Sequence, residues 1–377
     1  MIHPNQIRVG ITEWHGVAHE LAQFPPEGVS YSPIAAEKSR RIRLVRSQIK
    51  GYLRTFEAKD HDLIEAILSP IRTRSPWVYS IANFQEATAF SFLGVPLPRA
   101  ARVAYLERLL TAKNFRKLIF WSVAGQKSLR DYGFVTNPEI VAKTTVVYPA
   151  IRRVPDSKIR RYTDSPLQLL FGGDFFRKGG AHVVDAFQRA RKSHPHIMLR
   201  LCCDPDLDFN TKNPELRNRY LRRIRETPNI IIGRVSRAEM IEQILPATDI
   251  YLLPTYIEAF GYAILEAMAF GIPTIATNYF AIPELIGDQE DGLLIDTKPF
   301  SCERMFAGYR VDSIPASFHE YMTEGVYTRL KVLIESPERR ASIGRSALNS
   351  ARGRFSFTER NRRMSAIYSD ALYTTGR

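Results

Sequence analysis

The stretch DIYLLPTYIEAFGYAILEAMAFGIP, residues Asp249 to Pro273, decides the fold of the second half of the chain. Apolar residues fill its start as far as Pro254, where a strand is expected to end because proline cannot donate to a strand ladder. A loop follows, and a helix is expected from Gly261 to Phe270 with its positive end in that loop. A strand that feeds a loop and then a helix is the repeating unit of a parallel sheet, so the stretch predicts an α/β domain.

The same stretch carries two glutamates in different settings. Glu258 precedes the expected helix, whereas Glu266 lies more than one turn inside it, with apolar residues on every side. A buried carboxylate needs a polar partner, because an unpaired buried charge is costly. These two positions place the carboxylates where they can contact different parts of one extended ligand, and they do not suit a paired acid and base. The structural alternatives are a charge that favours the helix dipole for Glu258 and a surface position on an amphipathic helix for Glu266.

Alternating elements extend on both sides of this stretch. Strands are expected at 167–171, 197–202, 229–232, 249–253, 273–276 and 292–295, and helices at 180–192, 215–225, 237–245 and 261–270. The first half has the same rhythm, with strands at 7–11, 77–81, 118–121 and 145–148 and helices at 100–112 and 124–132. Residues 149–166 are polar, basic and proline-bearing, as linkers are. The sequence therefore predicts two α/β domains and a helical end after Pro315.

Two backbone turns are suited to phosphate. One contains Gly172, Gly173, Arg177 and Lys178 between the expected strand 167–171 and helix 180–192. Backbone amides and a lysine at such a turn can hold a phosphate, although a turn of this kind is by itself more often a solvated loop. The other is at the start of the helix after Glu258, where Phe260, Gly261 and Tyr262 let backbone amides approach a ligand closely.

These segments resemble one family. Glu258 and Glu266, with seven residues between them, lie within Pro254-Thr255 and Phe260-Gly261 and resemble the E-x7-E signature of retaining glycosyltransferases with the GT-B fold, the group 1 or family 4-like enzymes. Segments 271–277, 283–286 and 291–294 resemble that family's later segments in order, and 171–180 resembles its glycine-then-Lys-Gly segment. The family often has an arginine directly after the first glycine, where this chain has Gly173 and offers Arg177 instead. The resemblance covers residues 167–295.

The resemblance implies two Rossmann-like, doubly wound domains that face a central cleft. It implies an acceptor-binding domain over 1–155, a nucleotide-sugar donor-binding domain over 156–356, and a closing helix over 357–377 that crosses back to the first domain. The implied activity is that of a hexosyl- or glycosyltransferase that moves a sugar from a nucleotide diphosphate-sugar to an acceptor hydroxyl, with retention and without a metal or cofactor. The implied donor site has Glu266 on the ribose, Glu258 on the sugar, Lys178 and Arg177 on the diphosphate, and Phe260, Gly261, Gly172, Gly173 and Tyr262 around them.

The first half offers weaker candidates. His15 and Gly16 lie in the loop after the first strand, where the family usually places a glycine-rich turn. The family commonly has a histidine after a middle strand of this domain, but no histidine lies between His61 and His182; Asn83 and Glu86 occupy that neighbourhood instead. We interpret these four residues, His15, Gly16, Asn83 and Glu86, as candidate acceptor or sugar contacts, and each can also be an ordinary loop residue.

The net charge is +14, which attracts nucleic acid, anionic lipid or phosphorylated small molecules alike. The basic segment 38–54 carries an apolar stripe and can lie on an anionic membrane, but a core-facing helix with a basic solvated face is the preferred reading. If the segment binds lipid, the acceptor is a lipid-linked saccharide; a cell-surface polysaccharide is the other candidate. No helix-turn-helix, zinc-finger or aromatic RNA-binding signature supports a nucleic-acid-binding protein.

Other classes are disfavoured by the sequence. Its three cysteines, two of them adjacent, suit reduced thiols better than disulfides or metal ligands. No apolar run approaches the length of a membrane span, and the first residues do not resemble a signal peptide, so a cytoplasmic location is expected. No G-x-G-x-x-G follows the first strand, which argues against a dinucleotide-dependent oxidoreductase. A nucleotide-sugar epimerase or a phosphorylase of related fold stays open as an alternative.

Overall fold

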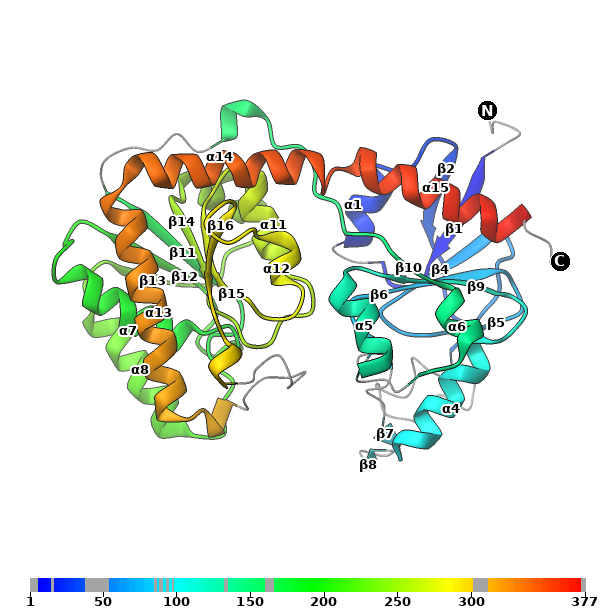
Figure 1. Cartoon of the computed structure of the whole chain (residues 1–377), viewed down its shortest axis with the longest axis horizontal. Helices are drawn as coiled ribbons and strands as arrows, with labels where there is room; N and C mark the ends of the chain where they lie inside the picture. The colour runs from blue at the N-terminus through cyan, green and yellow to red at the C-terminus, as the bar shows by residue number, and fades with distance from the viewer. Residues whose placement is uncertain are drawn as a thin grey trace. The chain divides into compact units, whose positions relative to one another are not determined.

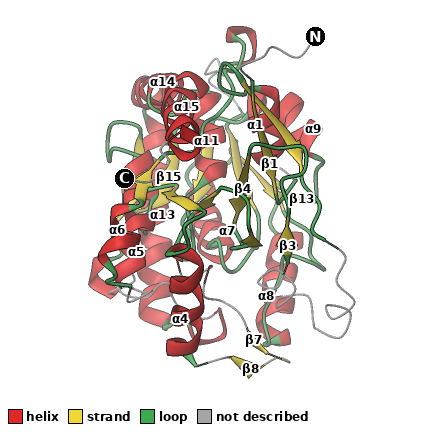
Figure 2. Cartoon of the chain, turned by 90° about the vertical axis from the view of Figure 1, so that its right-hand side faces the viewer, coloured by secondary structure: helices red, strands yellow, loops and turns green. Residues whose placement is uncertain are grey.

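The computed structural model describes residues 6–14, 17–37, 54–84, 87, 91–92, 95–96, 98–131, 135–159, 166–300 and 311–373 (Figure 1). The chain divides into two compact units. The first consists of Met1–Arg152 together with Phe355–Arg377, and the second is Arg153–Arg354. Figure 2 shows the elements by type, with helices in red and strands in yellow. Within the described ranges, no helix is long and apolar enough to cross a membrane.

The first unit is built on a parallel sheet of six strands in the order β10-β9-β6-β4-β1-β2. The strands are β1 (Ile7–Ile11), β2 (Val29–Pro33), β4 (Leu63–Ile67), β6 (Trp77–Ile81), β9 (Phe115–Phe120) and β10 (Thr144–Val146). The helices are α1 (Val17–Gln23), α4 (Arg99–Leu110), α5 (Val123–Asp131), α6 (Pro138–Ala142) and α15 (Phe357–Tyr373). Two-stranded pairs join β3 (Thr55–Phe56) to β5 (Arg72–Thr73) and β7 (Ser91–Phe92) to β8 (Val95–Pro96).

Both faces of this sheet are covered, as a doubly wound fold requires. Alternate residues of one strand face opposite sides, so Trp77 and Tyr79 of β6 pack in one core with α4, α5 and α6. Val78 of the same strand faces the other side and packs with α15, while α1 covers neighbouring residues on that side. The C-terminal helix α15 thus belongs to the first unit.

The second unit has its own parallel sheet, in the order β13-β12-β11-β14-β15-β16. The strands are β11 (Gln168–Gly172), β12 (Met198–Cys202), β13 (Ile230–Ile232), β14 (Ile250–Leu253), β15 (Thr274–Thr277) and β16 (Gly292–Ile295). The helices are α7 (Gly180–Arg191), α8 (Pro214–Glu226), α9 (Arg237–Glu239), α10 (Leu245–Ala247), α11 (Tyr262–Ala269), α12 (Ile282–Leu285), α13 (Ala316–Glu335) and α14 (Pro337–Gly353). Short 3-10 turns cover Asp156–Lys158, Lys298–Phe300 and Val311–Ser313.

The predicted α/β class and parallel sheets are confirmed, and the second sheet has a strand at each expected place. The helix expected at 237–245 is interrupted: α9 runs into a π-helical turn, Met240–Ile244, before α10. The unit boundary at Arg152 falls inside the expected linker, and the second boundary lies at Arg354. Strands β2 and β4 were not predicted. The basic segment 38–54 lies outside the described residues except Arg54, whose side chain pairs with Glu13 at 3.5 Å.

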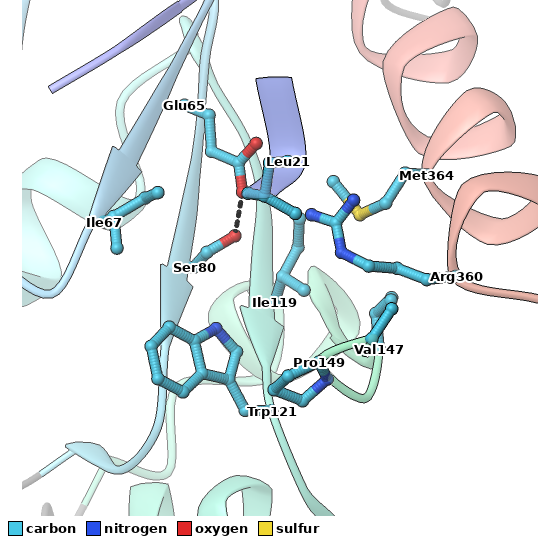
Figure 3. A pocket seen from close by; sticks show the side chains of 11 residues that line it. Leu21, Glu65, Ile67, Ser80, Ile119, Trp121, Val147, Pro149, Arg360 and Met364 are labelled. Carbon is cyan, nitrogen blue, oxygen red and sulfur yellow. Dashed lines mark hydrogen bonds between the residues drawn. The ribbon is translucent and has the colours of Figure 1, made fainter. Parts of the chain in front are cut away.

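A buried polar network joins α15 to the first sheet (Figure 3). Glu65 of β4 is 1% exposed, and its carboxylate accepts hydrogen bonds from Ser80 Oγ and from the Tyr368 hydroxyl, each at 2.5 Å. Figure 3 shows Arg360 of α15 pointing toward Glu65 and Ser80 across a cavity of about 20 Å³, room for about one water molecule. Burial opposes the charge of Arg360, but attraction to Tyr31, Tyr368 and Glu65 outweighs it and raises its pKa. The attraction between Arg360 and Glu65 offsets part of the cost of burying both charges.

A buried histidine makes the second unit sensitive to acid. His182 in α7 is 1% exposed, and burial together with the neighbouring His319 lowers its pKa from 6.5 to about 3. Between those pH values the unfolded chain binds a proton here that the folded chain does not, so stability falls as the pH falls. From pH 7 to pH 5, this one group is expected to cost about 2 kcal/mol of unfolding free energy.

The measurement is urea unfolding followed by circular dichroism, because the second unit contains no tryptophan. His182→Gln removes the titrating imidazole, whereas all other titratable groups are the same in wild type and variant. Wild type is expected to lose more stability than the variant between pH 7 and pH 5. An equal loss in both proteins would show that His182 does not titrate as described.

Candidate functional site

A cavity of about 520 Å³ opens at the carboxyl ends of the second sheet. Gly172, Cys202 and Leu253 are the last residues of β11, β12 and β14, and all three line it. Ligands of open parallel sheets bind at this edge, because loops there leave the strands and enter the helices. The cavity brings together six residues that the sequence singled out: Gly172, Gly173, Lys178, Glu258, Tyr262 and Glu266.

Glu258 is held in place by several donors. Its Oε2 atom accepts from Lys178 Nζ at 2.8 Å, and the same ammonium donates to the carbonyl oxygen of Ile257 at 2.9 Å. The Oε1 atom of Glu258 accepts from the backbone N–H groups of Ala259 at 3.0 Å and Phe260 at 3.4 Å. The Glu258 side chain is 15% exposed and that of Lys178 is 25% exposed, so the ion pair is partly shielded from water. A carboxylate and a cation therefore face the cavity in fixed positions.

Glu266 has the polar partner that its apolar surroundings required. It lies in α11, is 8% exposed, and forms an ion pair with Arg237. Ser236 positions that arginine, because its hydroxyl caps α9 by accepting from the Glu239 N–H at 3.1 Å. Arg237 could not be singled out from the sequence, since nothing near it in the chain distinguishes it from the solvent-facing arginines of other helices.

The two loops that carry these side chains are joined through backbone contacts. Gly179 has a φ of +85°, and a Cβ added there would lie 2.3 Å from the carbonyl oxygen of Pro254, so a side chain does not fit. The Tyr256 hydroxyl donates to the carbonyl oxygen of Phe176 at 2.7 Å, again from one loop to the other. Gly261, with a φ of +102°, directly precedes α11. The relative position of Lys178 and Glu258 therefore depends on close backbone packing.

Burial keeps two side chains of the cavity lining, Tyr251 and Cys202, uncharged. It is the first cause that raises the pKa of Tyr251, and the charges of Glu266 and Glu258 add to it. Burial likewise raises the pKa of the Cys202 thiol to about 11. Both groups are therefore protonated near neutral pH. Over the described ranges there is no group of three or more His, Cys, Asp or Glu side chains that could hold a metal ion.

The remaining predicted residues lie elsewhere. Arg177 is exposed and does not line the cavity; its N–H donates to Asp174 Oδ1 at 3.1 Å. Phe260 is 3% exposed, and neither Phe260 nor Gly261 lines the cavity. In the first unit, Asn83 is fully buried, two residues after β6. The other three candidates there, His15, Gly16 and Glu86, fall outside the described residues.

Comparison with known proteins adds a family to this geometry. Residues 155–304 match the model of the family glycosyl transferases group 1. D-inositol 3-phosphate glycosyltransferase of Corynebacterium kroppenstedtii is 26% identical over 289 residues, which cover 74% of this chain and 57% of that protein. Alpha-maltose-1-phosphate synthase of Mycolicibacterium smegmatis is 27% identical over 196 residues, 48% of each chain. The chain thus spans about half the length of the curated relatives it matches.

A solved structure extends the likeness to both units. Anabaena HepE, solved in complex with UDP and glucose, aligns with 97% of this chain and 100% of its own, with a TM-score of 0.66 and 15% identity. At that identity the likeness concerns the fold alone. Residues 155–304 thus resemble the glycosyl transferases group 1, and the two Rossmann-like units have the GT-B fold.

Proposed function

We propose that this protein transfers a sugar from a nucleotide diphosphate-sugar to an acceptor hydroxyl, with the donor bound in the cavity of the second unit. The observation that carries the proposal is the meeting of Lys178, Glu258 and Glu266 at the carboxyl ends of β11 and β14. The names of the relatives, two sugar-transferring or sugar-phosphate-forming enzymes and a protein solved with UDP and glucose, support it.

The proposed roles follow the order of groups along a donor. Glu266 binds the ribose hydroxyls, Lys178 the diphosphate, and Glu258 a hydroxyl of the sugar. As the bond between the anomeric carbon and the phosphate oxygen breaks, its electron pair moves to the diphosphate, and the Lys178 ammonium stabilises that charge. The acceptor oxygen forms the new bond on the same face of the sugar, and its proton goes to the departing phosphate oxygen. The configuration is then retained, and the protein's own cations serve in place of a metal.

The acceptor side of the proposal concerns the first unit. We propose a saccharide of the cell surface or a lipid-linked saccharide as the acceptor, and a cytoplasmic enzyme that contacts anionic lipid through residues 38–54. The net charge of +14 supports an anionic partner. Cosedimentation with vesicles that contain phosphatidylglycerol, compared with phosphatidylcholine vesicles, tests the lipid contact.

The activity test uses UDP-glucose, GDP-mannose and ADP-glucose in turn, with a panel of saccharide and lipid-linked acceptors. Release of nucleoside diphosphate is measured in magnesium and in EDTA, and the anomeric configuration of the product is read by NMR. We expect acceptor-dependent release that survives EDTA and a product with the donor's configuration. Inversion would contradict the mechanism, and release that needs magnesium would contradict metal independence.

Glu266→Ala is expected to weaken binding of the cognate nucleoside diphosphate by about 10- to 100-fold. The carboxylate makes charge-assisted hydrogen bonds to the ribose in this proposal, and each is worth about 1.5–3 kcal/mol. Calorimetric titration of wild type and variant measures the change, and Glu290→Ala, an exposed glutamate outside the cavity, is the matched control. Equal affinity in wild type and Glu266→Ala would refute the ribose role.

A further inference from the structure

The cavity contains a second cation that the phosphate turn does not supply. Of the two cations in the turn after β11, Lys178 lines the cavity and Arg177 does not. Gly173, in the same turn, has a φ of +100°, which disfavours any other residue and so any charged side chain there. Arg237 lines the same cavity from α9, a different element. The turn after β11 thus supplies one cation to the cavity, and α9 supplies the second.

We infer that Arg237 binds the phosphate of the donor nearest the ribose, as the second cation of the diphosphate site. The inference rests on the proposed function. Its geometric basis is the order of four charged side chains. Glu266, assigned to the ribose, is in contact with Arg237, and Glu258, assigned to the sugar, is in contact with Lys178.

That order matches the order of groups in a nucleotide sugar. Ribose, first phosphate, second phosphate and sugar follow one another along the ligand. A cation next to the ribose carboxylate can reach the first phosphate, and a cation next to the sugar carboxylate can reach the second. Arg237 is suited to this contact, because a planar guanidinium can donate two parallel hydrogen bonds to one phosphate.

The ion pairs also explain how an anion enters a site with two carboxylates. Each carboxylate is paired with its own cation, so the four charges cancel. When a donor binds, its hydroxyls donate to the carboxylates and its phosphates accept from the cations, so that both pairs exchange partners. The Arg237 side chain is 52% exposed, so it can turn from Glu266 toward a phosphate, whereas Glu266 is anchored in a buried helix. Arg237 therefore moves to the phosphate while Glu266 stays at the ribose.

A purely structural role makes a different prediction. If Arg237 only orients Glu266, its loss weakens every ligand that contains ribose, with or without phosphate. If it binds phosphate, its loss weakens the diphosphate and leaves the nucleoside unaffected. The comparison between nucleoside and nucleoside diphosphate therefore separates the two roles.

The experiment titrates UDP and uridine, with GDP and guanosine and ADP and adenosine in parallel, into wild type and Arg237→Met. For the pair whose diphosphate wild type binds, we expect Arg237→Met to lose about 10- to 100-fold in diphosphate affinity and less than about twofold in nucleoside affinity. Arg237→Lys should recover part of the loss. Arg234→Met, an exposed arginine outside the cavity, is the matched control and should match wild type.

Two results would overturn the inference alone: an unchanged diphosphate affinity in Arg237→Met, or equal losses for the diphosphate and the nucleoside. A large loss in Arg177→Met with none in Arg237→Met would return the role to the turn. If wild type binds no nucleoside diphosphate at all, the proposed function fails and the inference fails with it. Melting temperatures of all variants, measured without ligand, identify a variant that has lost its fold, and Arg237→Gln then replaces it.

Discussion

Lys178→Met is expected to lower kcat for sugar transfer by about 10²- to 10³-fold. A fixed donor aimed at developing charge commonly contributes this much to a rate. The substitution also leaves Glu258 without the ammonium that holds its Oε2 atom, so the sugar contact is weakened as well. Initial rates at saturating donor, with the donor and acceptor found by the activity screen, measure the change.

Lys192→Met is the matched control, because Lys192 is an exposed lysine that follows α7 and does not line the cavity. We expect its kcat to stay within about twofold of wild type, since an isolated surface charge contributes little. A Lys178→Met enzyme with nearly normal kcat and a raised KM would mean that the ammonium binds the donor without stabilising the transition state.

Glu65→Ala is expected to destabilise the first unit by about 3–5 kcal/mol. The change leaves Arg360 buried without its carboxylate and takes the acceptor from the hydroxyls of Ser80 and Tyr368. All three tryptophans, Trp14, Trp77 and Trp121, belong to the first unit, so tryptophan fluorescence reports its unfolding in urea. The midpoint should fall clearly, while ellipticity from the second unit is retained.

Two further variants separate the buried charge from simple loss of packing. Tyr368→Phe removes one donor to Glu65 and should cost only about 1–2 kcal/mol. The double variant Glu65→Leu with Arg360→Met removes both charges and should be more stable than Glu65→Ala alone, because no unpaired ion is left buried. A double variant no more stable than Glu65→Ala would show that the loss came from packing.

The second unit could be predicted closely because its strands are short apolar runs separated by clear helical patterns. Strand β14 ends just before Pro254, and α11 begins just after Gly261, so both ends carry their own local signals. Three functional candidates, Lys178, Glu258 and Glu266, lie in contiguous motifs and could be found for the same reason.

The first unit offered weaker signals. Strand β4 is fully buried yet has Glu65 at its centre, which interrupts the apolar run that marks a central strand. The burial of the Glu65 carboxylate is tolerated because Arg360 and Tyr368 interact with it, and both lie about three hundred residues later in the chain. Strand β2 has serines at alternate positions and ends at Pro33, which an edge strand tolerates. Its sequence is therefore hard to distinguish from that of a loop.

Two features of the cavity depend on three-dimensional structure: Lys178 lines it whereas Arg177 does not, and Arg237 lines it from another element. Adjacent residues in a turn point in different directions, and only the turn's conformation decides that Lys178 faces the cavity. Arg237 meets Glu266 because β13 and β14 and their loops end at the same edge of one sheet. The apolar neighbours of Glu266 predicted that it needs a polar partner, but the sequence could not say which residue provides it.

The most direct test of the donor site is a thermal-shift screen against UDP, GDP, ADP, TDP and their sugar conjugates, in magnesium and in a chelator. A ligand that binds only the folded protein stabilises it by about 2.7 kcal/mol at about 100 times its Kd, which corresponds to a rise in Tm of about 5–10 °C for a unit of this size. We predict that one nucleotide raises the Tm of wild type equally with and without metal, and raises that of Glu266→Ala much less. No shift with any nucleotide, or an equal shift in Glu266→Ala, would contradict it.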